Sequence, residues 1–212
     1  MIRPVNLLIA VSLLGFSLSA IAQTDSHFDD SPAKTLFHRS SWAHGYIHGY
    51  EAGFHSGNLD LHLARQIRDP HAVKEYKLAK HAFHKEFGNR SEFEKGYESG
   101  FEVGYVDGVT GKDFRAAGEA QLISEDLNGL GEPDAKHAAY FDTMLGSGYA
   151  TGRRIGLNDA RARSESSAGK AQCPEQVNAA QLCGAYRMGY RWGYTDGYSN
   201  QRPDAATQRA SK

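Results

Sequence analysis

Residues 96–108 read GYESGFEVGYVDG, with a glycine at every fourth position and an aromatic residue after three of them. The same spacing recurs in three other blocks of the chain. Each glycine costs about 1 kcal/mol relative to alanine in a helix interior, so the pattern requires a compensating contact. We assign twelve of these glycines to helix packing: Gly45, Gly49, Gly53, Gly96, Gly100, Gly104, Gly148, Gly152, Gly156, Gly189, Gly193 and Gly197.

A spacing of four favours an α-helix, because successive glycines then drift by only about 40° around the axis. They form one bare stripe that lets a second backbone approach closely, with an aromatic stripe beside it. A strand and a flexible glycine–tyrosine segment are the alternatives. The blocks run for thirteen residues or more, which is long for a strand, and they contain Glu, Arg and Met, which suit helices. We therefore predict an all-α fold, a compact helical bundle or helical repeat with amphipathic helices between four glycine helices.

The first 22 residues have the features of a signal peptide. Arg3 precedes an apolar stretch at residues 7–14 that is too short to span a bilayer, and Ala20-Ile21-Ala22 suits signal peptidase. We expect cleavage after Ala22, a flexible segment over 23–36, and a periplasmic or secreted location. An uncleaved membrane anchor is the alternative. No later stretch reaches eighteen apolar residues, so we expect no membrane span after cleavage.

The repeat interval suggests how the rest of the chain is organised. The blocks begin about 45 residues apart, which predicts stacked copies of one unit. We expect a single domain over 37–200, with degenerate repeats at about 37–87, 88–136, 137–172 and 173–200, and a disordered tail at 201–212. The spacing of Tyr76, Ala79, Phe83 and Phe87 predicts a core-facing helix after Pro70. Residues 118–136 predict a short helix and then a loop.

The charge of the expected mature chain bears on its partners. Residues 23–212 carry 23 Lys and Arg and 25 Asp and Glu, a formal charge of −2. This balance argues against a nucleic-acid partner, which requires a basic patch. We expect a protein partner in the cell envelope, and the sequence leaves the oligomeric state open.

The chain has two cysteines, Cys173 and Cys183. In an oxidising compartment such a pair normally forms a disulfide. Redox catalysis favours a Cys-x-x-Cys spacing, and a zinc site needs two further ligands nearby. We therefore predict a structural disulfide.

Histidines are concentrated in the first glycine block, where His44, His48, Glu51 and His55 would share a 60° arc of a helix. Imidazole with carboxylate suits a divalent transition metal such as zinc. The spacing lacks the HExxH arrangement of metalloproteases. We therefore expect these histidines to be structural and the protein to have no cofactor, and a divalent metal bound by the four residues is the alternative.

The sequence offers no recognised catalytic motif, and we predict no catalytic residues. Asp107 and Asp196 precede the last glycine of two blocks, which we interpret as a repeated structural position rather than a carboxylate pair in an active site. We expect an exported, non-enzymatic helical scaffold acting as a protein-binding or inhibitory, immunity-type module. The alternatives are a histidine-based metal-binding envelope protein and an enzyme of unrecognised type.

Overall fold

The computed structural model describes residues 39–134 and 136–199. This part of the chain contains six α-helices and four short 3₁₀ turns, and no strands, which confirms the predicted all-α fold. The α-helices are α2 (Ser41–His62), α3 (Ala79–Ala82), α4 (Arg90–Val109), α5 (Ala116–Leu130), α6 (Ala138–Ala162) and α7 (Ala180–Ser199). In these ranges we find no helix whose length and apolar character suit a membrane span. The segments predicted for 1–22, 23–36 and 201–212 lie outside the described residues.

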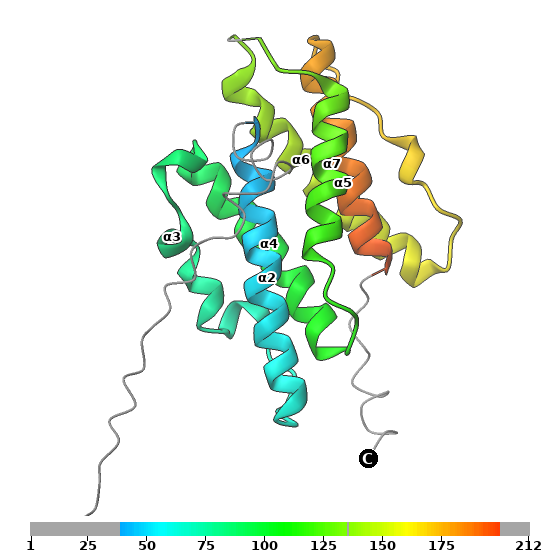
Figure 1. The fold of residues 1–212 in the computed structure, drawn as a ribbon. Helices are drawn as coiled ribbons and strands as arrows, with labels where there is room; N and C mark the ends of the chain where they lie inside the picture. The colour runs from blue at the N-terminus through cyan, green and yellow to red at the C-terminus, as the bar shows by residue number, and fades with distance from the viewer. Residues whose placement is uncertain (1–38, 135, 200–212) are drawn as a thin grey trace, which may run out of the picture.

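The four glycine helices pack two by two, α2 with α4 and α6 with α7 (Figure 1). A Cβ built on Gly49 would lie 1.9 Å from the carbonyl oxygen of Tyr97, and one on Gly100 would lie 1.9 Å from that of Tyr46. All twelve glycines that we assigned to packing face a partner backbone in this way, at 1.9–2.3 Å. Only a residue without a side chain allows such an approach.

The two helices of each pair run parallel. Along α2, Gly45, Gly49 and Gly53 meet Phe93, Tyr97 and Phe101 in the same order, and the contacts of α6 with α7 advance in the same way. The pairs also run parallel to each other, since Glu92 lies near Thr143 and Glu102 near Arg153. Helix α5 crosses α7 in the antiparallel direction, since Arg115 at its start lies near Asp196 and Asp126 further along lies near Arg191.

The two pairs are copies of one unit. In the first, Tyr105 donates a hydrogen bond to Asp60 (2.8 Å) and accepts one from the backbone N–H of Arg68 (3.0 Å). In the second, Tyr194 donates to Asp159 (2.9 Å) and accepts from the N–H of Ser167 (2.9 Å). Each predicted repeat contains one glycine helix. In the structure these four helices form two pairs, and each pair is one copy of a two-helix unit.

The parallel pairing explains the connection between α2 and α4. The chain must return from the end of α2 to the start of α4, and it does so in short pieces: η2 (Pro70–Ala72), η3 (Glu75–Leu78), α3 and η4 (Lys85–Phe87). The continuous helix predicted over Tyr76–Phe87 was therefore wrong, because Phe83 and His84 are extended. Phe87 is nevertheless fully buried, as a core-facing residue should be. Within the described part of 118–136, residues 118–130 are helical and 131–134 form the expected loop.

Candidate functional site

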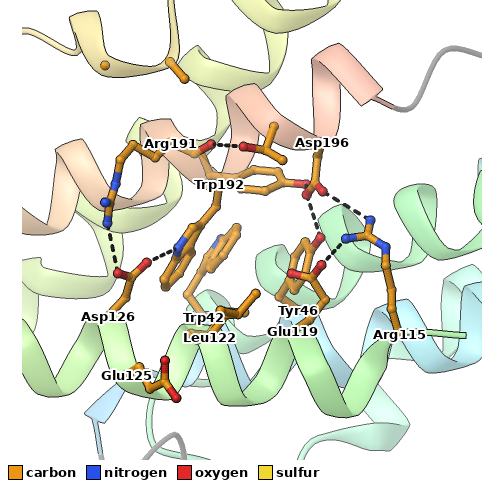
Figure 2. A pocket seen from close by; sticks show the side chains of 15 residues that line it. Trp42, Tyr46, Arg115, Glu119, Leu122, Glu125, Asp126, Arg191, Trp192 and Asp196 are labelled. Atoms are coloured by element: carbon orange, nitrogen blue, oxygen red, sulfur yellow. Dashed lines mark hydrogen bonds and ion pairs between the residues drawn. The ribbon is translucent and has the colours of Figure 1, made fainter.

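A pocket of about 410 Å³ opens where α5 crosses α2 and α7 (Figure 2). Its size is within the usual range of ligand sites. Aromatic, charged and aliphatic side chains from both helix pairs line it, together with Ala168 and Gly169 of η5 (Ala168–Lys170). The lining residues used below are Trp42, Tyr46, Arg115, Glu119, Leu122, Glu125, Asp126, Tyr149, Arg191, Trp192 and Asp196.

The floor of the pocket is a buried carboxylate held by two tyrosines. Asp196 accepts hydrogen bonds from the hydroxyls of Tyr46 (2.6 Å) and Tyr149 (2.8 Å). Burial and the charge of Asp196 raise the pKa of both phenols well above the ordinary value. The phenols therefore remain neutral donors. Because Tyr46, Tyr149 and Asp196 come from α2, α6 and α7, this cluster ties the two helix pairs together.

Arg115, the residue before α5, links the floor to the rest of the bundle. Its Nε donates to Asp107 (3.0 Å), while its two terminal nitrogens reach Glu119 and, at 3.4 Å, Asp196. The guanidinium also lies 5.2 Å from the ring centre of Tyr50. Although burial opposes its charge, the surrounding carboxylates raise the pKa of Arg115, so it stays a cation.

Glu119 pairs with Arg115 but lies among further carboxylates. Burial raises its pKa above the ordinary value, with Asp196 and Asp107 adding repulsion against the attraction of Arg115. On the far side, Lys112 binds Asp107 at 2.8 Å. Arg115 is thus left as the cation that Glu119 and Asp196 share at the pocket.

The two indoles of the chain line the pocket, and an exposed leucine lies at its mouth. Trp192 donates from Nε1 to Asp126 (2.7 Å), and Arg191 pairs with the same carboxylate at 3.0 Å (Figure 2). Trp42 stacks on Tyr46 with ring centres 5.6 Å apart. Leu122 is 59% exposed beside them. The chain has two tryptophans, and both line this pocket.

The histidines of the first glycine block lie elsewhere. His44 is buried against Phe87 (ring centres 4.2 Å apart), and its Nε2 lies 2.9 Å from that of His48. Glu51 is partly buried one turn further along α2, and His55 stacks beside Phe114 (5.5 Å).

Within residues 39–134 and 136–199, no group of three or more His, Cys, Asp and Glu side chains is placed to hold a metal ion. Of the four residues predicted for a metal site, His44 and His48 have adjacent rings. Metal binding stays a prediction, tested by metal analysis of untagged protein and of a variant with both His44→Ala and His48→Ala.

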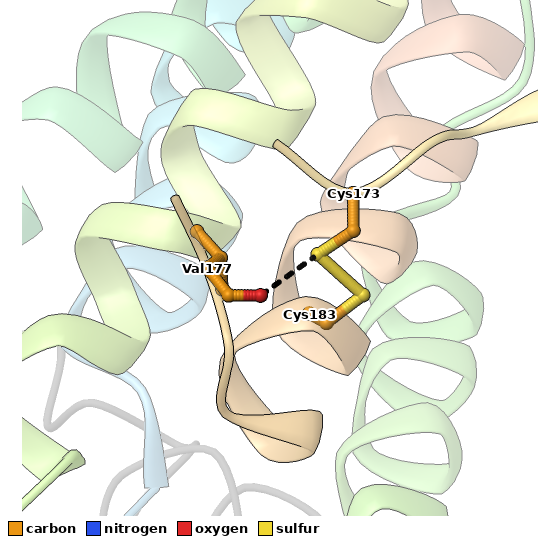
Figure 3. The surroundings of a disulfide bond; sticks show 3 residues. All are labelled: Cys173, Val177 and Cys183. Atoms are coloured by element: carbon orange, nitrogen blue, oxygen red, sulfur yellow. Dashed lines mark hydrogen bonds between the residues drawn. A yellow bond between two sulfur atoms is a disulfide. The ribbon is translucent and has the colours of Figure 1, made fainter. Parts of the chain in front are cut away.

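Cys173 and Cys183 form the predicted disulfide, with Cα atoms 5.5 Å apart (Figure 3). The bond joins the connection between α6 and α7 to the first turn of α7. Ala168 and Gly169 of the same connection line the pocket. The disulfide thus anchors the segment that forms one wall.

Sequence reasoning did not predict the pocket. Asp196 was interpreted as a scaffold position, which its bonds to Tyr46 and Tyr149 support, but it also forms the pocket floor. The i,i+4 spacing of Arg115 and Glu119 was a visible signal of a shared helix face. Compared with known proteins, the chain matches no family model, no curated protein and no solved structure.

Proposed function

We propose that this protein is an exported, non-enzymatic helical module that binds a protein partner in the cell envelope through the pocket between α5 and α7. Where the partner is an enzyme, such binding would inhibit it, as an immunity-type protein does. The observation that carries the proposal is the pocket of about 410 Å³ with both tryptophans of the chain in its wall. Aromatic pockets of this kind commonly hold the anchor residues of a partner.

The state of the polar groups supports binding rather than catalysis. Asp196 accepts from two tyrosine hydroxyls and lies near Arg115, so its oxygens are engaged in holding helices together. The tyrosines keep their protons because burial raises their pKa. A general base needs a carboxylate or imidazole that can take a proton from a substrate. The floor of this pocket is arranged as a structural cluster.

The framework of the pocket is also suited to binding. Its walls come from long helices that approach at backbone contact, and a disulfide fixes the connection beside it. A rigid surface binds with little loss of conformational entropy. The disulfide and the signal sequence features together favour an oxidising compartment outside the cytoplasm.

The experiment is capture of the partner from a cell-envelope extract with three forms of the full chain: wild type, Leu122→Ala at the mouth, and Tyr140→Ala as a control. Leu122 and Tyr140 are 59% and 60% exposed, so neither change should affect folding, and Tyr140 is not among the pocket-lining residues. We expect one stoichiometric partner with wild type and Tyr140→Ala, and a partner bound at least about 5-fold more weakly by Leu122→Ala. Equal affinity for all three forms would remove the pocket as the binding site.

A further inference from the structure

The charges around the pocket are unbalanced. Four carboxylates line it, on Glu119, Glu125, Asp126 and Asp196, against two guanidinium groups. Asp126 is neutralised by Arg191 at the mouth. Deeper in, Glu119 and Asp196 share the guanidinium of Arg115. An additional positive charge entering the pocket would therefore be attracted electrostatically.

The aromatic walls of the pocket also favour a cation. The indoles of Trp42 and Trp192 and the ring of Tyr46 all line the space next to these carboxylates (Figure 2). Aromatic faces attract ammonium and guanidinium groups, most strongly where water is excluded. The molecule already uses this contact at Arg115, which lies over the ring of Tyr50 at 5.2 Å. The apolar stem of a long basic side chain would pack on the exposed Leu122 at the mouth.

We infer that the pocket accepts a lysine or arginine side chain of the partner, with its stem beside Leu122 and its charge among the indoles and Glu119. The inference rests on the proposed function, because it names the chemistry of the anchor that the partner inserts. A basic side chain would restore the charge balance that Arg115 leaves incomplete. An acidic or purely aliphatic anchor would not.

The two tryptophans provide a reporter of the pocket. In a ¹H–¹⁵N NMR spectrum of the full chain, its two indole N–H signals both arise from the pocket wall. Three probes of similar length separate charge from shape: Nα-acetyl-arginine amide, Nα-acetyl-norleucine amide and Nα-acetyl-glutamine amide. We expect the arginine probe to shift both indole signals saturably, with a dissociation constant of about 1 mM. The norleucine and glutamine probes should bind at least about 5-fold more weakly.

A variant and a matched control test the role of charge. Glu119→Gln keeps the size of the side chain and removes its charge, whereas Glu165→Gln removes an exposed carboxylate outside the pocket. We expect Glu119→Gln to weaken the arginine probe about 3- to 10-fold and Glu165→Gln to leave it unchanged. Equal binding of all three probes, or an arginine affinity unaffected by Glu119→Gln, would overturn the inference.

Charge reversal at the mouth separates this inference from the proposed function. Partner capture should be lost with Leu122→Lys and retained with Leu122→Glu, because the first repels a basic anchor and the second attracts it. Equal loss with both variants would leave the pocket as the partner site but overturn the basic anchor. Equal retention would overturn the proposed function, even if the arginine probe binds.

Residues 200–212 carry three basic residues against one acidic residue, so the chain's own tail is another source of a basic side chain. If a chain that ends at Ser199 binds the arginine probe more tightly than the full chain, the pocket is occupied by this tail and the inference is overturned.

Discussion

Replacing Gly100 by alanine tests the glycine contact between α4 and α2. A Cβ at this position would lie 1.9 Å from the carbonyl oxygen of Tyr46, 2.8 Å from its carbonyl carbon and 2.9 Å from the nitrogen of Tyr50. All three atoms belong to backbone, so no side-chain rotation can relieve the clash. Ordinary contact begins at 3.4 Å, so the two helices must separate locally by about 1.5 Å.

The expected cost follows from this displacement. Overpacking typically destabilises by about 1–3 kcal/mol, and a clash between two backbones should exceed that range because neither helix can yield alone. The higher helix propensity of alanine offsets about 1 kcal/mol. We therefore expect Gly100→Ala to lower the free energy of unfolding by at least about 2 kcal/mol. For a domain of this size that corresponds to a Tm lower by about 4–8 °C.

Gly129→Ala is the matched control. Gly129 also lies in a helix, α5, but a Cβ there would meet no atom within 4 Å. The substitution should therefore raise the free energy of unfolding by up to about 1 kcal/mol. Thermal and urea unfolding followed by circular dichroism would measure both variants. A Gly100→Ala protein as stable as wild type, or two variants that change stability in the same direction, would refute the packing argument.

Three further predictions concern side chains rather than the glycine contacts. Burial raises the pKa of Asp142 from 3.8 to about 6, so the folded state holds an extra proton between these two pH values. The free energy of unfolding should therefore fall by about 2–3 kcal/mol as the pH rises through this range. Urea unfolding at pH 4 and pH 7 should show this fall in wild type and a smaller one in Asp142→Asn. Tyr46→Phe removes a hydrogen bond to the buried Asp196 and should cost about 1.5–3 kcal/mol in the same assay, and an unchanged midpoint would show that this bond does not stabilise the fold. Replacing Cys173 and Cys183 by alanine should lower the free energy of unfolding by about 2–3 kcal/mol relative to wild type under oxidising conditions, and a wild type whose stability does not change when reductant is added would contradict the disulfide.

The helices and the disulfide were predictable because their signals are local. A glycine at every fourth residue identifies a helix with one bare face from a single segment of sequence. The pairing of these faces is not a local property, since any two bare stripes could approach each other. In the structure, side-chain contacts that join distant segments accompany the pairing, such as Tyr105 with Asp60 and Tyr194 with Asp159.

The connection between α2 and α4 shows how tertiary structure overrides a local pattern. Tyr76, Ala79, Phe83 and Phe87 have helical spacing, but the parallel arrangement of α2 and α4 forces the chain to travel back along the bundle. The chain meets this requirement with short turns and an extended step at Phe83, while Phe87 still reaches the core. Spacing thus identified a buried face correctly and its secondary structure incorrectly.

The pocket was hidden from sequence reasoning for a related reason. Its principal residues come from three helices far apart in the chain and from the cap of one of them: Tyr46 of α2, Arg115 just before α5, Glu119 of α5, and Trp192 and Asp196 of α7. No short motif contains them. Their juxtaposition follows from the docking of α5 across α2 and α7, which becomes visible only once the two glycine pairs are assembled.

The central claim is that the glycine faces pair α2 with α4 and α6 with α7, with the helices of each pair parallel. Nuclear Overhauser effects between backbone protons test it most directly. A Cβ on Gly49 would lie 2.7 Å from the Cα of Tyr97, and one on Gly152 would lie 2.0 Å from the carbonyl oxygen of Tyr190. The Hα protons of these glycines should therefore show strong effects to backbone protons around Tyr97 and Tyr190, respectively. Effects that instead join Gly49 to α6, or that advance in opposite directions along the two helices of a pair, would contradict the account.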